Sequence, residues 1–178
     1  MSRRDERAAF EEYVAARRPA LVRTAYLLCG DPHLAEDLVQ GALIKAVGVW
    51  RRIGDNPEPW LRRVMVHDHI SRWRRHRGRE QLTDVLPERP SVERERDPGL
   101  ADALRALAPR QRAVVVLRYY EDLTERETAD LLGVSVGTVK SQHADALRRL
   151  RALVPDLIGM PDPNDPAALA SVQRKAVP

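Results

Sequence analysis

The chain has 178 residues, which is enough for one or two small domains with modest hydrophobic cores. Aromatic residues make up 4% of it, a composition that favours helical bundles over a β-sandwich, and the formal net charge of +4 is compatible with a nucleic-acid partner. The one cysteine, Cys29, excludes an intramolecular disulfide and a metal site with four cysteine ligands.

The amino-terminal segment is charged and lacks the apolar core of a signal peptide, and nowhere do 18 apolar residues follow one another. We therefore expect a soluble, cytoplasmic protein without membrane insertion. Basic residues are unevenly spread. Residues 51–79 carry a local charge of +6, residues 80–108 a charge of −3, and residues 109–154 a charge of +2. The basic groups thus concentrate in two places on either side of an acidic span.

The first expected helix covers residues 5–29, where apolar residues recur three, four or seven positions apart. Pro19 should kink or interrupt it, because proline lacks the N–H and clashes with the preceding turn. Gly30 should end this helix. Asp31 and Pro32 then restart the chain as a capping residue followed by a proline in the first helical turn.

A second helix is expected over residues 32–50. Its apolar stripe, which should face a core, consists of Ala35, Leu38, Val39, Ala42, Ala46, Val47 and Trp50. Its polar side carries Glu36, Asp37, Gln40 and Lys45. Gly41 lies inside this helix, at a cost of about 1 kcal/mol relative to alanine.

Residues 56–59 should form a loop, and a third helix is expected over residues 60–77. Its apolar positions are Leu61, Val64, Met65, Ile70 and Trp73. Arginines crowd the same helix. A solvated helix end is one interpretation, but the local charge and a tryptophan at each end favour contact with nucleic acid. His67 and His69 lie about 200° apart around a helix axis and cannot chelate one metal ion.

Residues 78–98 are expected to be a flexible linker, because they combine prolines and mixed charges with no sustained helical period. Helical periodicity resumes at Leu100, and Pro109 should begin a further helix. Residues 155–178 are rich in proline and polar groups, so we expect a mobile tail there.

Residues 123–147 have the pattern of a helix-turn-helix. Thr124 can cap the first helix and form a capping box with Glu127. Gly133 suits a left-handed residue at the turn, and Ser135 can cap the second helix. The small core expected around this turn comprises Ala129, Leu131, Leu132, Val134, Val136, Val139 and Leu147. An ordinary helical hairpin with a glycine turn is the alternative interpretation.

Three blocks of the chain resemble a bacterial RNA polymerase sigma factor of the extracytoplasmic-function (ECF) group in the sigma-70 family. They are AEDLVQGALIKAVGVW (35–50), PWLRRVMVHDHISRWRR (59–75) and LAPRQRAVVVLRYYEDLTERETADLLGVSVGTVKSQ (107–142). They occur in the family's order, and the resemblance covers about residues 8–153. It implies an all-α fold with sigma domain 2 over residues 5–77 and sigma domain 4 over residues 99–154, joined by the linker.

The resemblance assigns each block a task in transcription initiation. The first would dock on the polymerase β′ clamp coiled coil through Asp37, Leu38, Gln40, Leu43 and Val47. The second would melt and read the −10 promoter element through Trp60, Arg62, Arg63, His67, Ser71, Arg72, Arg74 and Arg75. The third would read the −35 element through Ser135, Thr138, Lys140, Ser141, Gln142 and Asp145.

As a sigma factor the protein would have no catalytic activity of its own and would need no cofactor or metal. Its partners would be core polymerase, through the β′ clamp and the β flap, and promoter DNA in double- and single-stranded form. The family also admits an anti-sigma factor as a partner. A stand-alone helix-turn-helix regulator is a rival interpretation, although the first half shows no ligand-pocket pattern. An enzyme is a second rival, but no paired-carboxylate, Ser-His-Asp or phosphate-loop pattern is present.

The sequence departs from the family pattern at a few positions. An acidic residue is common where Gly41 stands, and asparagine is usual where His67 stands. Arginine is common at the positions of Gln142 and Asp145, so a bidentate guanine contact is lost and the −35 preference cannot be taken from relatives. We hypothesise that the Asp145 carboxylate, placed near DNA phosphates, lowers non-specific affinity.

Overall fold

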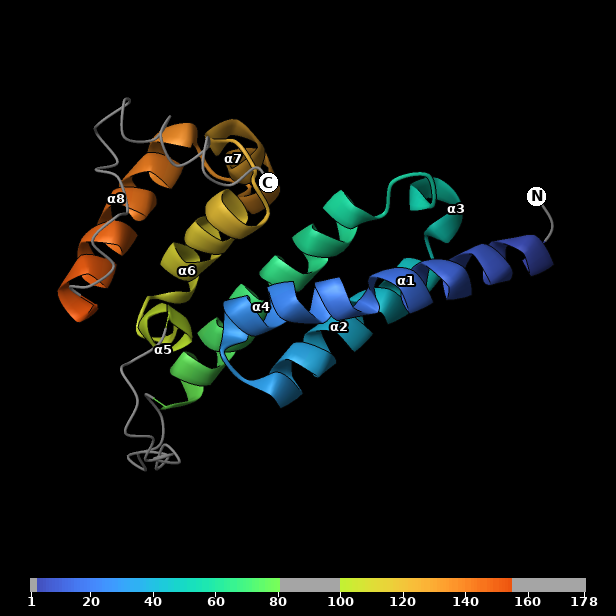
Figure 1. Ribbon diagram of the computed structural model, residues 1–178, viewed down its shortest axis with the longest axis horizontal. Coiled ribbons are helices and arrows are strands. Elements are labelled where there is room, and N and C mark those ends of the chain that lie inside the picture. The colour runs from blue at the N-terminus through green and yellow to red at the C-terminus, as the bar shows by residue number, and fades with distance from the viewer. Residues whose placement is uncertain (1–2, 81–99, 155–178) are drawn as a thin grey trace. The chain divides into compact units, whose positions relative to one another are not determined.

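The computed structural model describes residues 3–80 and 100–154, and the regular secondary structure in these ranges is entirely helical (Figure 1). The chain divides into two compact units, Met1–Asp97 and Pro98–Pro178. The first contains α1 (Arg3–Cys29), α2 (Pro32–Val47), α3 (Trp50–Ile53) and α4 (Glu58–Glu80). The second contains α5 (Leu100–Arg105), α6 (Pro109–Val115), the π-helical turn η1 (Val116–Tyr120), α7 (Glu125–Leu132) and α8 (Val136–Leu153). The expected all-α fold of two small helical domains is confirmed.

The region expected to link the two domains begins inside α4, because this helix extends to Glu80 and includes residues 78–80. The rest of that region lies outside the described residues, as does the tail expected over residues 155–178. The exact domain boundaries stay a prediction.

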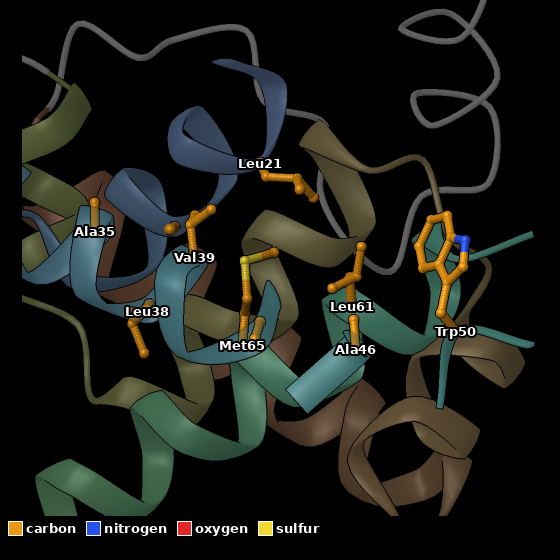
Figure 2. Packing of buried hydrophobic residues seen from close by; sticks show 10 residues of the cluster. Leu21, Ala35, Leu38, Val39, Ala46, Trp50, Leu61 and Met65 are labelled. Carbon is orange, nitrogen blue, oxygen red and sulfur yellow. The ribbon is translucent and has the colours of Figure 1, made fainter. Parts of the chain in front are cut away.

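The first unit is a bundle in which α1, α2 and α4 pack against one another. Its hydrophobic core, much of which Figure 2 shows, consists of Leu21, Ala25, Ala35, Leu38, Val39, Ala42, Ala46, Trp50, Leu61 and Met65. Trp50 of α3 extends this core towards α1. The Phe10 ring meets the indole edge-on at a centroid distance of 5.0 Å, and the Tyr13 ring lies at 5.4 Å. The amino-terminal half of α1 is therefore anchored on α3 by aromatic contacts.

The turn between α1 and α2 has the predicted chemistry. Gly30 adopts a φ of 75°, which ends α1 in the left-handed region that glycine accepts without strain. Asp31 caps α2 by accepting a 2.9 Å hydrogen bond from the Leu34 backbone N–H, and Pro32 follows it in the first turn. These three residues fix where α2 begins.

Of the two outcomes expected at Pro19, interruption of the helix is wrong, because α1 continues through this residue, and a kink there stays a prediction. A proline inside a helix costs about 3 kcal/mol, mainly through one lost hydrogen bond and one steric clash. Tyr13 before it and Leu21 after it both pack on the same core, and the burial of such residues along the helix offsets that local cost. Pro19 itself is exposed, so water can reach the backbone around it.

The single helix expected over residues 32–50 is instead two helices, with α2 ending at Val47 and α3 beginning at Trp50. Val47 does not join the core stripe as expected, because its side chain is 61% exposed. It lies seven residues after Gln40, so the two side chains are only about 20° apart around the helix axis. Val47 therefore belongs to the polar side of α2.

The loop expected over residues 56–59 is shorter than predicted, since α4 already begins at Glu58. Pro59 stands in the first turn of α4, where a missing N–H costs nothing because it would have no helical partner. The Pro57 carbonyl accepts a 2.9 Å hydrogen bond from the Leu61 N–H and so joins the first turn of this helix.

The second unit has its own core, in which α6 and α7 pack against α8. The turn region is held by buried Val114, Ala129 and Val139, with Leu132 and Val134 packed against them. Leu131 and Leu147 are also buried, as expected. Val136 was expected in this core but is exposed. It is the first residue of α8, so no earlier turn of that helix covers it.

An arginine that the sequence did not single out holds α5 near α6. The Arg112 side chain is buried, and its Nη2 donates to the carbonyls of Arg105 and Leu107 over 2.6 and 3.2 Å. These carbonyls belong to the end of α5 and the residues after it, which lack helical donors. A buried guanidinium thus supplies the cap that the backbone does not.

His143 of α8 is almost fully buried, and its Nε2 lies 3.0 Å from the Tyr119 hydroxyl. Burial lowers the pKa of His143 below its ordinary value, and the nearby Arg118 guanidinium lowers it further. Burial also raises the pKa of Tyr119. The fold therefore favours neutral His143.

We expect the protein to lose stability when the pH falls from about 7.5 to about 5.5, because the unfolded chain binds a proton that folded His143 resists. This contribution is present above the ordinary histidine pKa and is lost on acidification. His143→Gln should flatten the pH dependence of the melting temperature, measured by circular dichroism. His33→Gln, at an exposed position of α2, is the matched control and should retain the wild-type dependence. Equal slopes for His143→Gln and wild type would contradict this assignment.

Candidate functional site

The helix-turn-helix is built by three local devices. Thr124 Oγ1 accepts from the Glu127 N–H at 3.2 Å, and the Thr124 N–H donates to Glu127 Oε2 at 2.7 Å, which completes the predicted capping box. Hydrogen bonds from the Thr124 side chain and backbone lower the pKa of Glu127. Gly133 takes a left-handed φ of 66°, and Ser135 Oγ caps α8 by accepting from the Thr138 N–H at 3.1 Å. The predicted turn and both caps are confirmed.

Hydroxyl groups line the start of α8, the helix expected to read DNA. Ser135 Oγ and Thr138 Oγ1 lie 2.9 Å apart, and Ser141 Oγ donates to the Thr138 carbonyl at 3.0 Å. These bonds hold the side chains in place while their oxygens can still accept hydrogen bonds from base edges. Gln142 is half-buried beside them.

The two charged residues predicted on α8 each have a partner within the second unit. Lys140 Nζ lies 3.7 Å from Glu125 Oε2 of α7, and Asp145 Oδ1 lies 2.6 Å from Arg148 Nη2. Arg148 was not among the residues predicted to read DNA. Its place three residues after Asp145 on a helix is the signal that could have found it.

The predicted docking residues on α2 divide between its two sides. Asp37, Gln40 and Val47 are exposed, and Leu43 is half-buried against the core. Leu38 was expected to contact a partner, but only 2% of its surface is exposed. It lies about 100° from Asp37 around the axis and faces α1 and α4, so it supports the surface from behind.

Ile44 also lies on this surface, although it was not among the predicted docking residues. Its side chain is 66% exposed, more than any other large apolar side chain among the residues described. It follows Asp37 by seven positions and Gln40 by four, so all three lie on one side of α2. An apolar residue at the centre of a polar helix side is the signal that could have found it. We call Asp37, Gln40, Ile44 and Val47 the α2 face.

The residues predicted to read the −10 element lie on α4 with unequal exposure. The exposed ones are Arg63, His67, Arg74 and Arg75. Ser71 and Arg72 are half-buried, and the Trp60 ring packs against the hydrophobic core. Trp73 was predicted as an apolar position of this helix and as one of the two tryptophans that favour contact with nucleic acid, and its indole is partly exposed beside the arginines. An aromatic surface for stacking is therefore offered by Trp73 more than by Trp60.

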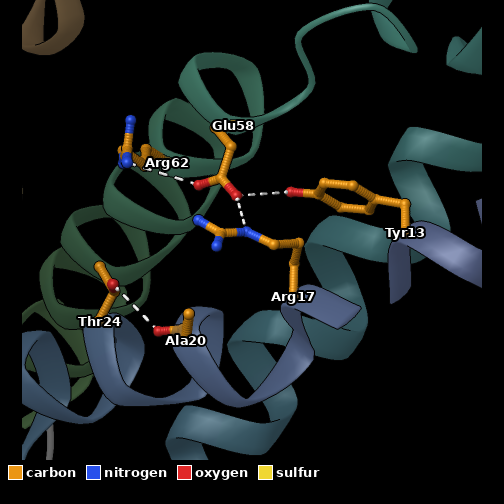
Figure 3. Close-up of polar contacts among 6 residues, drawn as sticks. All are labelled: Tyr13, Arg17, Ala20, Thr24, Glu58 and Arg62. Atoms are coloured by element: carbon orange, nitrogen blue, oxygen red, sulfur yellow. Dashed lines mark hydrogen bonds and ion pairs between the residues drawn. The ribbon is translucent and has the colours of Figure 1, made fainter. Parts of the chain in front are cut away.

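Arg62 belongs to a polar cluster around Glu58 that joins α1 to α4 (Figure 3). Glu58 Oε1 accepts from Arg17 Nε at 2.6 Å and from the Tyr13 hydroxyl at 3.3 Å, and Oε2 lies 3.4 Å from Arg62 Nη2. Burial, and then the Glu58 charge, raises the pKa of Tyr13 strongly. Glu58 thus gathers two cations and a phenol, and it pairs with Arg62 within α4 while it accepts from two residues of α1.

Two ion pairs connect α2 to α4. Lys45 Nζ lies 2.6 Å from Asp68 Oδ2, and Arg72 Nη1 lies 3.9 Å from Asp37 Oδ2. The second pair joins a residue of the α2 face to one of the predicted −10 residues. The predicted docking surface on α2 and the predicted −10 residues on α4 are therefore neighbours.

Within residues 3–80 and 100–154, no group of three His, Cys, Asp or Glu side chains is placed to hold a metal ion. The helices of these ranges include none that combines the length and the apolar character needed to cross a membrane.

Two family models match the chain, Sigma-70 region 2 over residues 13–79 and Sigma-70 region 4 over residues 103–152. The first match spans α2, α3 and most of α4 together with part of α1. The second spans the helix-turn-helix. The matches therefore fall on the two units separately.

Several characterised proteins are similar over most of their length. The RNA polymerase sigma-E factor of Streptomyces coelicolor is 46% identical over 148 residues, which cover 80% of this chain and 84% of that protein. The ECF RNA polymerase sigma factor SigL of Mycobacterium tuberculosis is 36% identical over 163 residues, covering 85% and 89%. A co-crystal structure of the sigma factor RpoE with the anti-sigma factor NepR from Bartonella quintana matches with a TM-score of 0.62 and 27% identity. That match covers 81% of this chain and 95% of that one.

Proposed function

Because this chain belongs to the ECF group of the sigma-70 family, it is an alternative sigma factor for transcription initiation, and we propose how its residues divide that work. The α2 face docks on core RNA polymerase, α4 holds the −10 element as it opens, and α8 reads the −35 element. The protein acts in the cytoplasm together with the polymerase. The observation that carries this proposal is the exposed Ile44 on the α2 face, because an apolar side chain so exposed favours a protein partner.

Docking through the α2 face has a simple chemical basis. Ile44 and Val47 supply apolar area at the centre, while Asp37 and Gln40 supply hydrogen-bonding groups beside it. This is the composition of an interface with an apolar centre and a polar rim. The resemblance to the family makes the partner the β′ clamp coiled coil, and the β flap is the corresponding partner of the second unit.

The −10 element is held by cations and an aromatic ring together. Arg63, Arg74 and Arg75 are exposed to meet phosphates, and Trp73 offers a ring on which an unstacked base can lie. Trp60 and Arg62 have a supporting role in this proposal, since one packs on the core and the other faces Glu58. Each stacking step lost on melting costs about 1.4 kcal/mol, so opening several of them requires the polymerase as well.

An anti-sigma partner is also part of the proposal. The solved RpoE structure that matches this chain holds the anti-sigma factor NepR. We infer that such a regulator would cover the α2 face, because an exposed apolar surface favours a protein partner. The rival proposal of a stand-alone regulator has no observation in its favour.

The decisive experiment is transcription with purified components. Added to core RNA polymerase, the full chain should direct initiation from specific fragments of a genomic promoter library, with permanganate-reactive thymines at the start site. The chain alone should open none of these fragments. Comparable strand opening without core polymerase would contradict the proposed function.

A further inference from the structure

We propose that Arg148 contacts a DNA backbone phosphate at the −35 element and that Asp145 is a positioning residue that holds its guanidinium. This inference rests on the proposed function, since it needs α8 to lie on DNA. It replaces the expectation that Asp145 merely repels DNA. The carboxylate would instead act through its neighbour.

The contact between the two side chains leaves the guanidinium available. Asp145 Oδ1 and Arg148 Nη2 are 2.6 Å apart, and the Arg148 side chain is 77% exposed. An arginine has five N–H donors in a rigid fork, so one nitrogen on the carboxylate leaves donors for a phosphate. The Arg148 guanidinium therefore stays accessible to a phosphate, while its hydrogen bond to Asp145 restricts its conformation.

The position of Arg148 along α8 suits a phosphate at the edge of the groove. Seven residues separate it from Ser141, so the two side chains differ by only about 20° around the axis and by about 10 Å along it. The major groove is about 12 Å wide. When Ser141 lies at the base edges, Arg148 reaches the backbone that borders the groove.

Three other basic side chains of the second unit are engaged elsewhere. Lys140 faces Glu125 of α7, Arg112 is buried, and Arg118 Nη1 donates to the Leu123 carbonyl at 2.5 Å. In the contacts described, Arg148 has Asp145 as its one partner. It is therefore well placed to carry a phosphate contact.

Holding an arginine in advance improves binding because less side-chain freedom is lost when the phosphate arrives. Asp145 therefore has two opposite effects on DNA affinity. Its charge repels phosphate, and its hydrogen bond to Arg148 favours the contact. These effects separate in a double-mutant cycle, because the second requires Arg148 and the first does not.

The test uses the full chain with Asp145→Asn, Arg148→Gln and both changes together. Binding to DNA is followed by fluorescence anisotropy across a salt titration. The labelled duplex has a mixed sequence and is about 30 base pairs long, so that one recognition helix can lie on it. Arg148→Gln should weaken binding on the order of tenfold, as for one charge-assisted hydrogen bond. It should also reduce the slope of log affinity against log salt by about 0.9, because one phosphate contact is lost.

The cycle should show coupling between the two positions. We compare the change in DNA affinity that Asp145→Asn causes in two backgrounds. This change should be about threefold less favourable in the presence of Arg148 than in the Arg148→Gln background, a size typical of exposed ion pairs. Arg110→Gln is the matched control, since it removes one exposed charge from α6 and should show no coupling with Asp145→Asn. Circular dichroism melts should be unchanged for all variants, because both side chains lie at the surface.

Strictly additive effects, or a salt slope unaffected by Arg148→Gln, would overturn this inference. Wild-type protein is assayed in parallel for initiation with core polymerase. Initiation together with an additive cycle rejects only the role of Arg148, whereas no initiation rejects the proposed function itself.

Discussion

Replacing Ile44 by aspartate is expected to abolish assembly with core RNA polymerase while leaving the fold intact. Ile44 is the most exposed large apolar side chain among the residues described and lies at the centre of the α2 face. A hot-spot residue at the centre of an interface contributes about 2 kcal/mol or more, and a carboxylate buried there adds a desolvation cost. We expect affinity for core to fall at least about 100-fold, measured by anisotropy of labelled protein.

The matched control is Leu34→Asp on the same helix. Leu34 is also an exposed apolar residue, but it lies at the start of α2 and about 80° from Ile44 around the axis. A carboxylate near a helix N-terminus is tolerated by the helix dipole. Core binding should therefore stay close to wild type. Equal losses for both variants, or none for Ile44→Asp, would place the docking surface elsewhere.

Replacing Leu38 by alanine is expected to destabilise the first unit without removing a contact to the polymerase. Leu38 is 2% exposed and packs in the core between α1, α2 and α4. Removing a buried leucine side chain costs about 2–5 kcal/mol, partly as lost transfer energy and partly as a cavity. Urea unfolding followed by circular dichroism should report a loss of this size for the first unit.

Val47→Ala is the control for that measurement, since Val47 is exposed on the same helix and should change stability by less than about 0.5 kcal/mol. At low temperature, where the folded state of Leu38→Ala is still populated, this variant should bind core polymerase nearly as well as wild type. Stable protein with lost core binding would instead restore Leu38 to the interface.

Features decided by a few neighbouring residues could be predicted from the sequence. Asp31 caps α2, Ser135 caps α8, and Gly133 takes the left-handed turn conformation between α7 and α8. Each cap or turn depends on contacts between residues three or four positions apart along the chain, so the residue types are sufficient to predict it. The helix-turn-helix was accessible to sequence analysis for this reason.

The side of α2 that faces the core was predicted from helical spacing, because six of the seven residues in the expected stripe are buried. The exception is Val47, which like Ile44 is apolar but exposed, and a local pattern did not show that the bundle leaves these two side chains uncovered. The Glu58 cluster is a second example, because Tyr13 lies 45 positions away from Glu58 in the sequence. Such a contact depends on how two helices meet, which no local pattern encodes.

Pro19 has a consequence for the way α1 opens. The proline cannot donate to the backbone ladder, so the helical hydrogen bonds before and after it are joined less cooperatively. The part before it is held by side chains instead, through Tyr13 on Trp50 and through Arg17 on Glu58. Amide hydrogens ahead of Pro19 should exchange with solvent through a local opening whose free energy is set by those anchors, independently of global unfolding.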